Sequence, residues 1–216
     1  MKKLLLILLC LPLINLAQQT YVPDDNFEQA LINLGYDNIL DDSVTTGNIN
    51  TVMYLSIQNQ NISDLTGVGG FSALEYLECY NNQLTSLDVS GNPALIELEC
   101  QDNQLASLDV SQNTYLIDLR CHDNQLTSLD VSANTFLEYL FCFSNQLTSL
   151  DVSNNSTLIY LYSQSNQLVS LNVTASTSLY FLKCEYNQLT SLDVSTNTAL
   201  QHLHCYSNQL TSLDVS

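Results

Sequence analysis

The sequence has very few basic residues and little glycine or proline. Of its 216 residues, 4 are Lys or Arg and 22 are Asp or Glu, which gives a formal net charge of -18 at pH 7. Such a charge repels phosphates over most of the surface, so nucleic-acid binding through a basic surface is excluded. With only 6 Gly and 3 Pro, the chain is neither collagen-like nor a flexible linker. The hydrophobic content of 45% is enough for one core of ordinary size.

Residues 1–17 have the features of a secretory signal peptide. A pair of lysines precedes an apolar run over residues 4–13, and Ala17 is a small residue at the expected cleavage site. This run is too short for a comfortable membrane span. The sequence therefore predicts a protein that is secreted or held at the bacterial cell surface, including the outer membrane. After removal of the peptide, Arg120 and Lys183 are the remaining Lys and Arg residues.

A repeat of 21 residues organises nearly all of the remaining sequence. Each unit follows the pattern LxxLx(C/S)xxNQL, and the regular units open at Leu74, Leu95, Leu116, Leu137, Leu158, Leu179 and Leu200. The motif LxxLxΦxxN occurs twice in most units, so apolar and polar residues alternate in both halves at the period of a β-strand. These features predict a mainly β repeat solenoid, in which stacking buries side chains that no single turn could bury alone.

The repeat resembles that of the leucine-rich repeat proteins, specifically a bacterial short-repeat class, over residues 52–216. The stretch before it resembles the N-terminal cap of the internalin-like group, because Pro23 and Asp24 precede the apolar residues Phe27 and Leu31, and Gly35 follows. We expect a cap over residues 18–51 with one short helix, a divergent turn over 52–73 and seven regular repeats over 74–216. The resemblance implies parallel strands on a concave binding face and an extended second arm.

The seventh unit stops at Ser216 without an atypical closing repeat. An apolar end of the solenoid and an unpaired edge strand would then be exposed. We therefore expect an uncapped C-terminal end, either because the natural chain continues or because copies of the protein associate end to end through this turn.

Two repeated positions are predicted to build the core. The first column comprises Asn82, Asn103, Asn124, Asn145, Asn166, Asn187 and Asn208. A buried carboxamide can pair backbone groups that a sharp turn leaves free, so these residues are expected to support turns. The second column comprises Cys79, Cys100, Cys121, Cys142, Cys184 and Cys205. We favour free thiols over disulfides, because a strand spacing of about 4.8 Å keeps their Cβ atoms too far apart.

A third column carries carboxylates and is predicted to face outward. It comprises Asp88, Asp109, Asp130, Asp151, Asp193 and Asp214. Solvated carboxylates are the favoured interpretation, and calcium bound along the column is the alternative, because hard cations take oxygen ligands. No other metal or cofactor is predicted.

The positions that vary from unit to unit lie on the first strand and are rich in aromatic residues. The residues predicted to bind a ligand are Tyr139, Phe141, Phe143, Tyr160, Tyr162, Tyr180, Phe181 and Lys183. Acidic residues precede the aromatic middle of this face, and its last turns mix Lys183, Glu185, Tyr186, His202, His204 and Tyr206. Contiguous exposed aromatics usually mark recognition, although stacked rings that merely stabilise the sheet are an alternative.

No nucleophile elbow, Gly-rich phosphate loop or HExxH motif is found, so the sequence does not predict an enzyme. The favoured function is a secreted or cell-surface adhesion module that binds an extracellular protein through the concave aromatic face. One alternative is a carbohydrate- or cell-wall-binding protein whose tyrosines stack on sugar rings. Another is a structural spacer in a longer adhesin. The repeat itself does not identify the partner.

Overall fold

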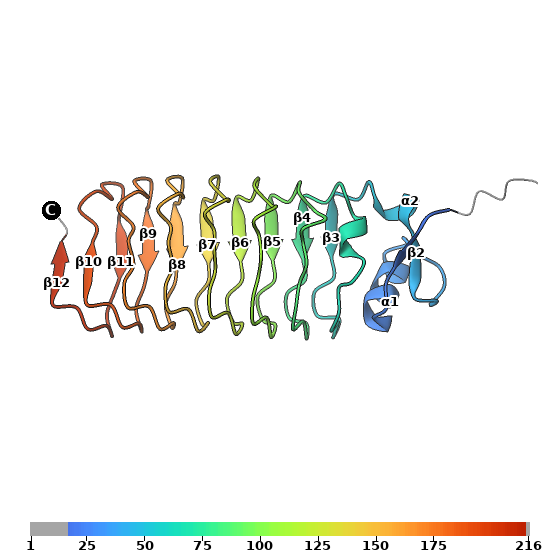
Figure 1. The fold of residues 1–216 in the computed structure, drawn as a ribbon, viewed down its shortest axis with the longest axis horizontal. Coiled ribbons are helices and arrows are strands. Elements are labelled where there is room, and N and C mark those ends of the chain that lie inside the picture. The colour runs from blue at the N-terminus through green and yellow to red at the C-terminus, as the bar shows by residue number, and fades with distance from the viewer. Residues whose placement is uncertain (1–16, 215–216) are drawn as a thin grey trace, which may run out of the picture.

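The computed structural model describes residues 17–214, and its main element is a parallel sheet of eight strands. Each strand comes from one turn of the solenoid, and the strands lie side by side along its length (Figure 1). In chain order they are β3 (Tyr54–Ser56), β4 (Tyr76–Glu78), β5 (Glu97–Glu99), β6 (Asp118–Arg120), β7 (Tyr139–Phe141), β8 (Tyr160–Tyr162), β9 (Phe181–Lys183) and β11 (His202–His204). We call this side of each turn the strand arm.

Strands of neighbouring turns pair in register between equivalent repeat positions. Leu98 of β5 is opposite Leu119 of β6, which in turn is opposite Leu140 of β7. This register places each repeat position in a column along the molecule. The three leucines are fully buried and belong to one continuous core. The predicted repeat solenoid with parallel strands is therefore confirmed.

The other side of each turn, which we call the opposite arm, is extended but forms little sheet. Only β10 (Ser191–Asp193) and β12 (Ser212–Asp214) pair as parallel strands there within the described residues. Isolated bridges join Asp88 to Asp109 and Asp151 to Asn172. The expected extended second arm is present, and it lacks the continuous hydrogen-bonded ladder of the strand arm.

A short helix lies before the repeats, as predicted. Helix α1 (Asp25–Asn33) is capped by Asp24, whose carboxylate accepts hydrogen bonds from the backbone N–H groups of Asn26 and Phe27. Phe27 and Leu31 are fully buried on one face. The chain leaves the helix through Gly35, whose φ of 83° favours glycine. The helix therefore lies between the start and stop residues that the sequence indicated.

The N-terminal region also contains elements that the sequence analysis did not predict. Strand β1 (Gln19–Tyr21) pairs antiparallel with β2 (Ser43–Thr45), and α2 (Thr46–Ile49) follows. Glu28 of α1 is fully buried, and its carboxylate accepts hydrogen bonds from the backbone N–H groups that lead into β2. A 3-10 turn, η1 (Val68–Gly70), lies in the divergent turn before the first regular repeat.

Two sequence predictions fall wholly or partly on residues 1–16 and 215–216, which are outside the described range. The signal peptide is one, apart from Ala17, and the uncapped C-terminal end is the other. Both stay predictions. Across residues 17–214, no helix has the length and apolar character needed to cross a lipid bilayer.

Candidate functional site

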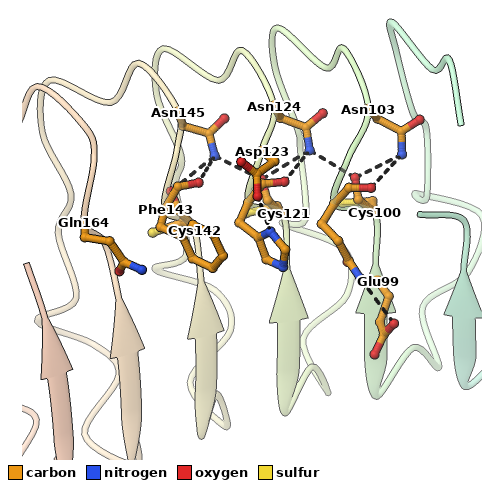
Figure 2. A network of polar contacts seen from close by, with 12 residues as sticks. Glu99, Cys100, Asn103, Cys121, Asp123, Asn124, Cys142, Phe143, Asn145 and Gln164 are labelled. Atoms are coloured by element: carbon orange, nitrogen blue, oxygen red, sulfur yellow. Dashed lines mark hydrogen bonds and ion pairs between the residues drawn. The ribbon is translucent and has the colours of Figure 1, made fainter. Parts of the chain in front are cut away.

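The asparagines of the strand arm are part of the framework and not of a ligand site. The Asn124 Nδ2 donates to the carbonyl oxygens of Cys100 and Cys121 at 3.0 and 3.2 Å. Its Oδ1 accepts from the Leu105 backbone N–H at 2.9 Å. Figure 2 shows the equivalent carboxamides of Asn103 and Asn145 in the same row. These bonds confirm the predicted turn-support role and leave the carboxamides engaged.

The cysteine column is a packed row of thiols. All six cysteines within the described residues are free, in line with the packing interpretation. Burial raises the pKa of the Cys79 and Cys142 thiols to about 12, so they stay protonated and unreactive near neutral pH. Ser163 occupies the one interrupted position, where its hydroxyl donates to the Lys183 carbonyl oxygen at 3.3 Å. The column contributes to the core, and the variable surface lies outside it.

The aspartate column also has a structural role. The Asp88 carboxylate accepts from the Ser90 backbone N–H at 2.9 Å, and Asp109, Asp130, Asp151 and Asp193 repeat this turn. Hydrogen bonds with the Ser90 side chain and backbone hold the pKa of Asp88 below its usual range. Within residues 17–214, no group of three or more His, Cys, Asp or Glu is arranged to hold a metal ion. This geometry does not support the calcium alternative.

The aromatic residues of the predicted site gather on the open face of the sheet, opposite the leucine core. Tyr139 stacks on Tyr160 with ring centroids 5.4 Å apart, and Tyr160 stacks on Phe181 at 6.3 Å. Phe141 meets Tyr162 edge-on at 4.8 Å, and Tyr162 meets Phe181 at 5.4 Å. We define the aromatic patch as Tyr139, Phe141, Tyr160, Tyr162, Tyr180 and Phe181. Strands β7, β8 and β9 present most of it.

The structure corrects the prediction in two respects. The rings of the patch are half-buried and not fully exposed, because residues of adjacent turns cover one another. Phe143 does not join the patch. It stacks instead on His122, with centroids 4.1 Å apart, because its repeat position lies beyond the end of the strand. The other predicted site residues, including Lys183, are brought together.

An acidic cluster lies on one side of the patch. We define the acidic end as Glu78, Glu97, Glu99 and Asp118, on strands β4 to β6. The Arg120 guanidinium lies 2.8 Å from both Glu99 and Asp118 and 3.9 Å from Glu97. Burial, the hydrogen bond with Glu99 and the nearby carboxylate charges raise the pKa of Glu97 to about 7. One guanidinium therefore does not neutralise this end.

Basic side chains lie on the other side of the patch. We define the basic end as Lys183, His202 and His204, on β9 and β11. The Lys183 Nζ lies 4.5 Å from the centroid of the Tyr162 ring and 5.5 Å from that of Phe181. His202 stacks on Phe181 at 4.7 Å. Among residues 17–214, no carboxylate lies within ion-pair distance of Lys183.

A second apolar surface was missed by the sequence analysis. It is an open groove of about 380 Å³ beside the start of strands β5 to β7, and its lining is Ala94, Ile96, Tyr115, Ile117, Phe136, Glu138 and Thr157. We call it the flank groove. Tyr115 and Phe136 are 62% and 55% exposed, more than any ring of the patch. The signal was present in the sequence, because both precede an opening leucine, where other units have Ala, Thr or Ser.

Comparisons with known proteins find similar solved structures but no matching family model. No protein-family model matches the chain, and no curated protein matches it. Among solved structures, internalin C2 from Listeria monocytogenes is 22% identical with a TM-score of 0.82, over 91% of each chain. The leucine-rich repeat ectodomain of the receptor kinase GASSHO1/SCHENGEN3 from Arabidopsis thaliana, in complex with Casparian strip integrity factor 2, is 24% identical with a TM-score of 0.62. That match covers 70% of this chain and 20% of the other.

A further solved structure is more similar in sequence. The functional domain of InlJ from Listeria monocytogenes, described as including a cysteine ladder, is 38% identical with a TM-score of 0.85. The match covers 92% of this chain and 45% of that one, so the chain spans less than half of the InlJ domain. The 21-residue repeat, the parallel solenoid and this similarity together identify the chain as an internalin-like leucine-rich repeat protein.

Proposed function

We propose that this protein is a non-catalytic adhesion module, secreted or held at the cell surface, that binds an extracellular protein through the aromatic patch. The gathering of aromatic rings beside Lys183, on a sheet face whose first strands are acidic, carries the proposal. Aromatic side chains bury a large area and lose little conformational entropy on binding, so they are enriched where proteins recognise one another.

A purely structural role for the rings is the main competing explanation. Stacked rings do stabilise neighbouring strands. The opposite arm, however, keeps its turns in place with Asp, Ser and Thr at its outward positions. Since the solenoid does not need rings in order to stack, their concentration on β7 to β9 favours binding. The receptor ectodomain solved in complex with Casparian strip integrity factor 2 is an example of a leucine-rich repeat solenoid in a complex.

The test compares binding with and without the patch. The chain without residues 1–17 is used to select binders from a random dodecapeptide phage library. A variant with Phe141→Ser, Tyr160→Ser, Tyr162→Ser and Phe181→Ser is used in parallel. The matched control carries Tyr115→Ser and Phe136→Ser in the flank groove. We expect the wild type and the control to enrich the same peptides and the patch variant to lose them. Circular dichroism checks that all three remain folded.

The outcomes separate the proposed functions. Equal enrichment by the patch variant would move the site away from the patch, and loss in the control alone would move it to the flank groove. The carbohydrate-binding alternative predicts binding to a glycan array that the patch variant loses, with no enriched peptide. If neither library nor array yields a patch-dependent ligand, the binding proposal is wrong and the spacer alternative is favoured.

Export is proposed from residues 1–17 and has its own test. The full chain is expressed in a bacterial host, and the N-terminus of the exported protein is sequenced. We expect cleavage after Ala17, so that the mature chain begins at Gln18. Recovery of the chain only inside the cell with Met1 retained would contradict export. Fractionation of the envelope distinguishes a secreted protein from one held at the outer membrane.

A further inference from the structure

Charge is ordered along the open face of the sheet. Carboxylates dominate strands β4 to β6, the rings of the aromatic patch occupy β7 to β9, and the basic side chains lie on β9 and β11. Arg120 belongs to the acidic end by position, but its charge is taken up by Glu99 and Asp118 at 2.8 Å. The Lys183 ammonium group lies over two rings, and within the described residues no carboxylate is within ion-pair distance of it. The carboxylates of the acidic end and the ammonium group of Lys183 therefore lie on opposite sides of the aromatic patch.

From this order we infer that the ligand of the aromatic patch is an extended peptide segment with a basic residue at one end, apolar residues in the middle and an acidic residue at the other. The inference rests on the proposed function of the patch. The basic residue lies against the acidic end, near Glu78 and Glu97. The acidic residue lies against Lys183 and the neighbouring histidines. The apolar residues pack on the rings between them.

The sheet fixes the spacing between the two charges. From β5 to β9 the order is β5-β6-β7-β8-β9, and adjacent strands lie about 4.8 Å apart. The two ends are therefore about 19 Å apart, or about 24 Å when measured from β4. An extended chain advances about 3.3 Å per residue, so the segment carries its opposite charges about six or seven residues apart. Either chain direction satisfies this requirement.

Ligands of other chemistry fit the face less well. A neutral glycan could stack on the rings but would leave both charged ends without partners. A polyanionic glycan or a nucleic acid would meet repulsion from the acidic end, where the raised pKa of Glu97 already reflects carboxylate crowding and burial. A uniformly basic segment would be attracted by the carboxylates of the acidic end but repelled by Lys183. A segment with separated opposite charges is complementary to both ends.

The experiment analyses the peptides that depend on the aromatic patch in the phage selection. Their sequences are compared, and the affinities of synthetic copies are measured by fluorescence anisotropy at two salt concentrations. The protein variants are Lys183→Glu at the basic end and Glu78→Gln at the acidic end. Asp130→Asn is the control, because it removes one negative charge from the opposite arm. Lys183→Arg tests whether charge alone is sufficient.

We expect the enriched peptides to share a basic and an acidic residue about six positions apart, with aromatic or aliphatic residues between them. Lys183→Glu should weaken binding about tenfold or more and Glu78→Gln several-fold, with smaller losses at high salt. Asp130→Asn and Lys183→Arg should have little effect. Selection on the Lys183→Glu protein should replace the acidic residue with a basic one.

Two results would overturn the inference, and they are distinguishable. Peptides that need the patch but lack the charge order, or that bind the Lys183→Glu protein equally well, would refute it and leave the proposed function intact. The absence of any patch-dependent peptide would refute the proposed peptide ligand and the binding proposal together.

Discussion

The two arms of each turn share one leucine motif but differ in their strand pairing and in their outward residues. The strand arm is paired in a continuous sheet, and its outward residues change from turn to turn. The opposite arm has few paired strands and repeats nearly the same Asp and Ser residues. One acid of each arm also differs in the direction of its pKa shift, since the pKa of Glu97 on the strand arm is raised and that of Asp109 on the opposite arm is lowered. Variable and nearly invariant outward residues thus occupy different sides of one repeat.

The largest expected difference between the arms concerns their asparagines. Asn124 of the strand arm is hydrogen-bonded through both its Nδ2 and its Oδ1. Its loss leaves the Leu105 N–H without a partner and removes one of the two donors from the carbonyl oxygens of Cys100 and Cys121, which still accept from Asn103 and Asn145. Asn134 of the opposite arm donates to the carbonyl oxygens of Val110 and Asn113, but its Oδ1 has no partner within the described residues. We predict that Asn124→Ala lowers the free energy of unfolding by about 3 kcal/mol and Asn134→Ala by about half as much.

Urea denaturation followed by circular dichroism checks this prediction. Both side chains lie in central turns and are at least nine-tenths buried, so position along the solenoid does not distort the comparison. Equal losses in the two variants would mean that the hydrogen bond from the Leu105 N–H to the Asn124 Oδ1 adds nothing to stability.

Arg120 distinguishes the acidic end from the rest of the strand arm. Replacement by Gln leaves Glu97, Glu99 and Asp118 without their shared cation. Because Arg120 is partly exposed and its pairs are screened by water, we expect a loss of about 2 kcal/mol at pH 8. The loss should shrink at pH 5, where Glu97, with its pKa raised to about 7, is protonated and no longer needs the cation. Lys183→Gln is the matched control, and denaturation should show little change for it at either pH.

Replacement of Glu97 is expected to change stability less than replacement of Arg120, and the change should depend on pH. Burial, the bond with Glu99 and the adjacent carboxylates raise its pKa from 4.5 to about 7 in the folded state. The folded protein therefore holds this proton more tightly than the unfolded chain, and stability is lost as pH rises from about 4.5 to about 7. Glu97→Gln should remove that loss and stabilise the protein by about 1 kcal/mol at pH 8, after allowance for solvent screening. At pH 4 the gain should vanish, and a gain that persists there would contradict the assignment.

The sequence predicted the residue columns of the repeat but missed several side-chain contacts between adjacent turns. The leucine, asparagine and cysteine columns follow from a fixed period, because stacking turns residue positions into columns. A sequence period does not determine the side-chain conformations that bring residues of different columns into contact. It did not indicate that Phe143 turns to His122 or that Tyr115 and Phe136 line a groove. The pairing of β1 with β2 was missed because it joins single stretches outside the repeat.

The smallest predicted effect on stability comes from Asp130 of the opposite arm. It tests whether the pKa shift of this acid is opposite in sign to that of Glu97. Asp130 accepts from the Ser132 backbone N–H at 2.9 Å, and hydrogen bonds with the Ser132 side chain and backbone lower its pKa from the usual 3.8. The stability that this carboxylate contributes is therefore present above pH 3.8 and is lost as pH falls through the lowered pKa. Asn172 shows that a carboxamide keeps the turn, because its Oδ1 accepts from the Thr174 N–H at 3.1 Å.

Asp130→Asn should consequently melt close to the wild type at pH 7 and lose less stability than the wild type when the pH is lowered to 3. Thermal unfolding at both pH values measures this small difference. Glu97→Gln shows its gain at high pH instead, because the pKa shifts of the two acids have opposite signs. If both variants gained at the same end of the pH range, the acids of the two arms would not differ as the structure indicates. The difference between the two arms would then rest on the variable outward residues of the strand arm alone.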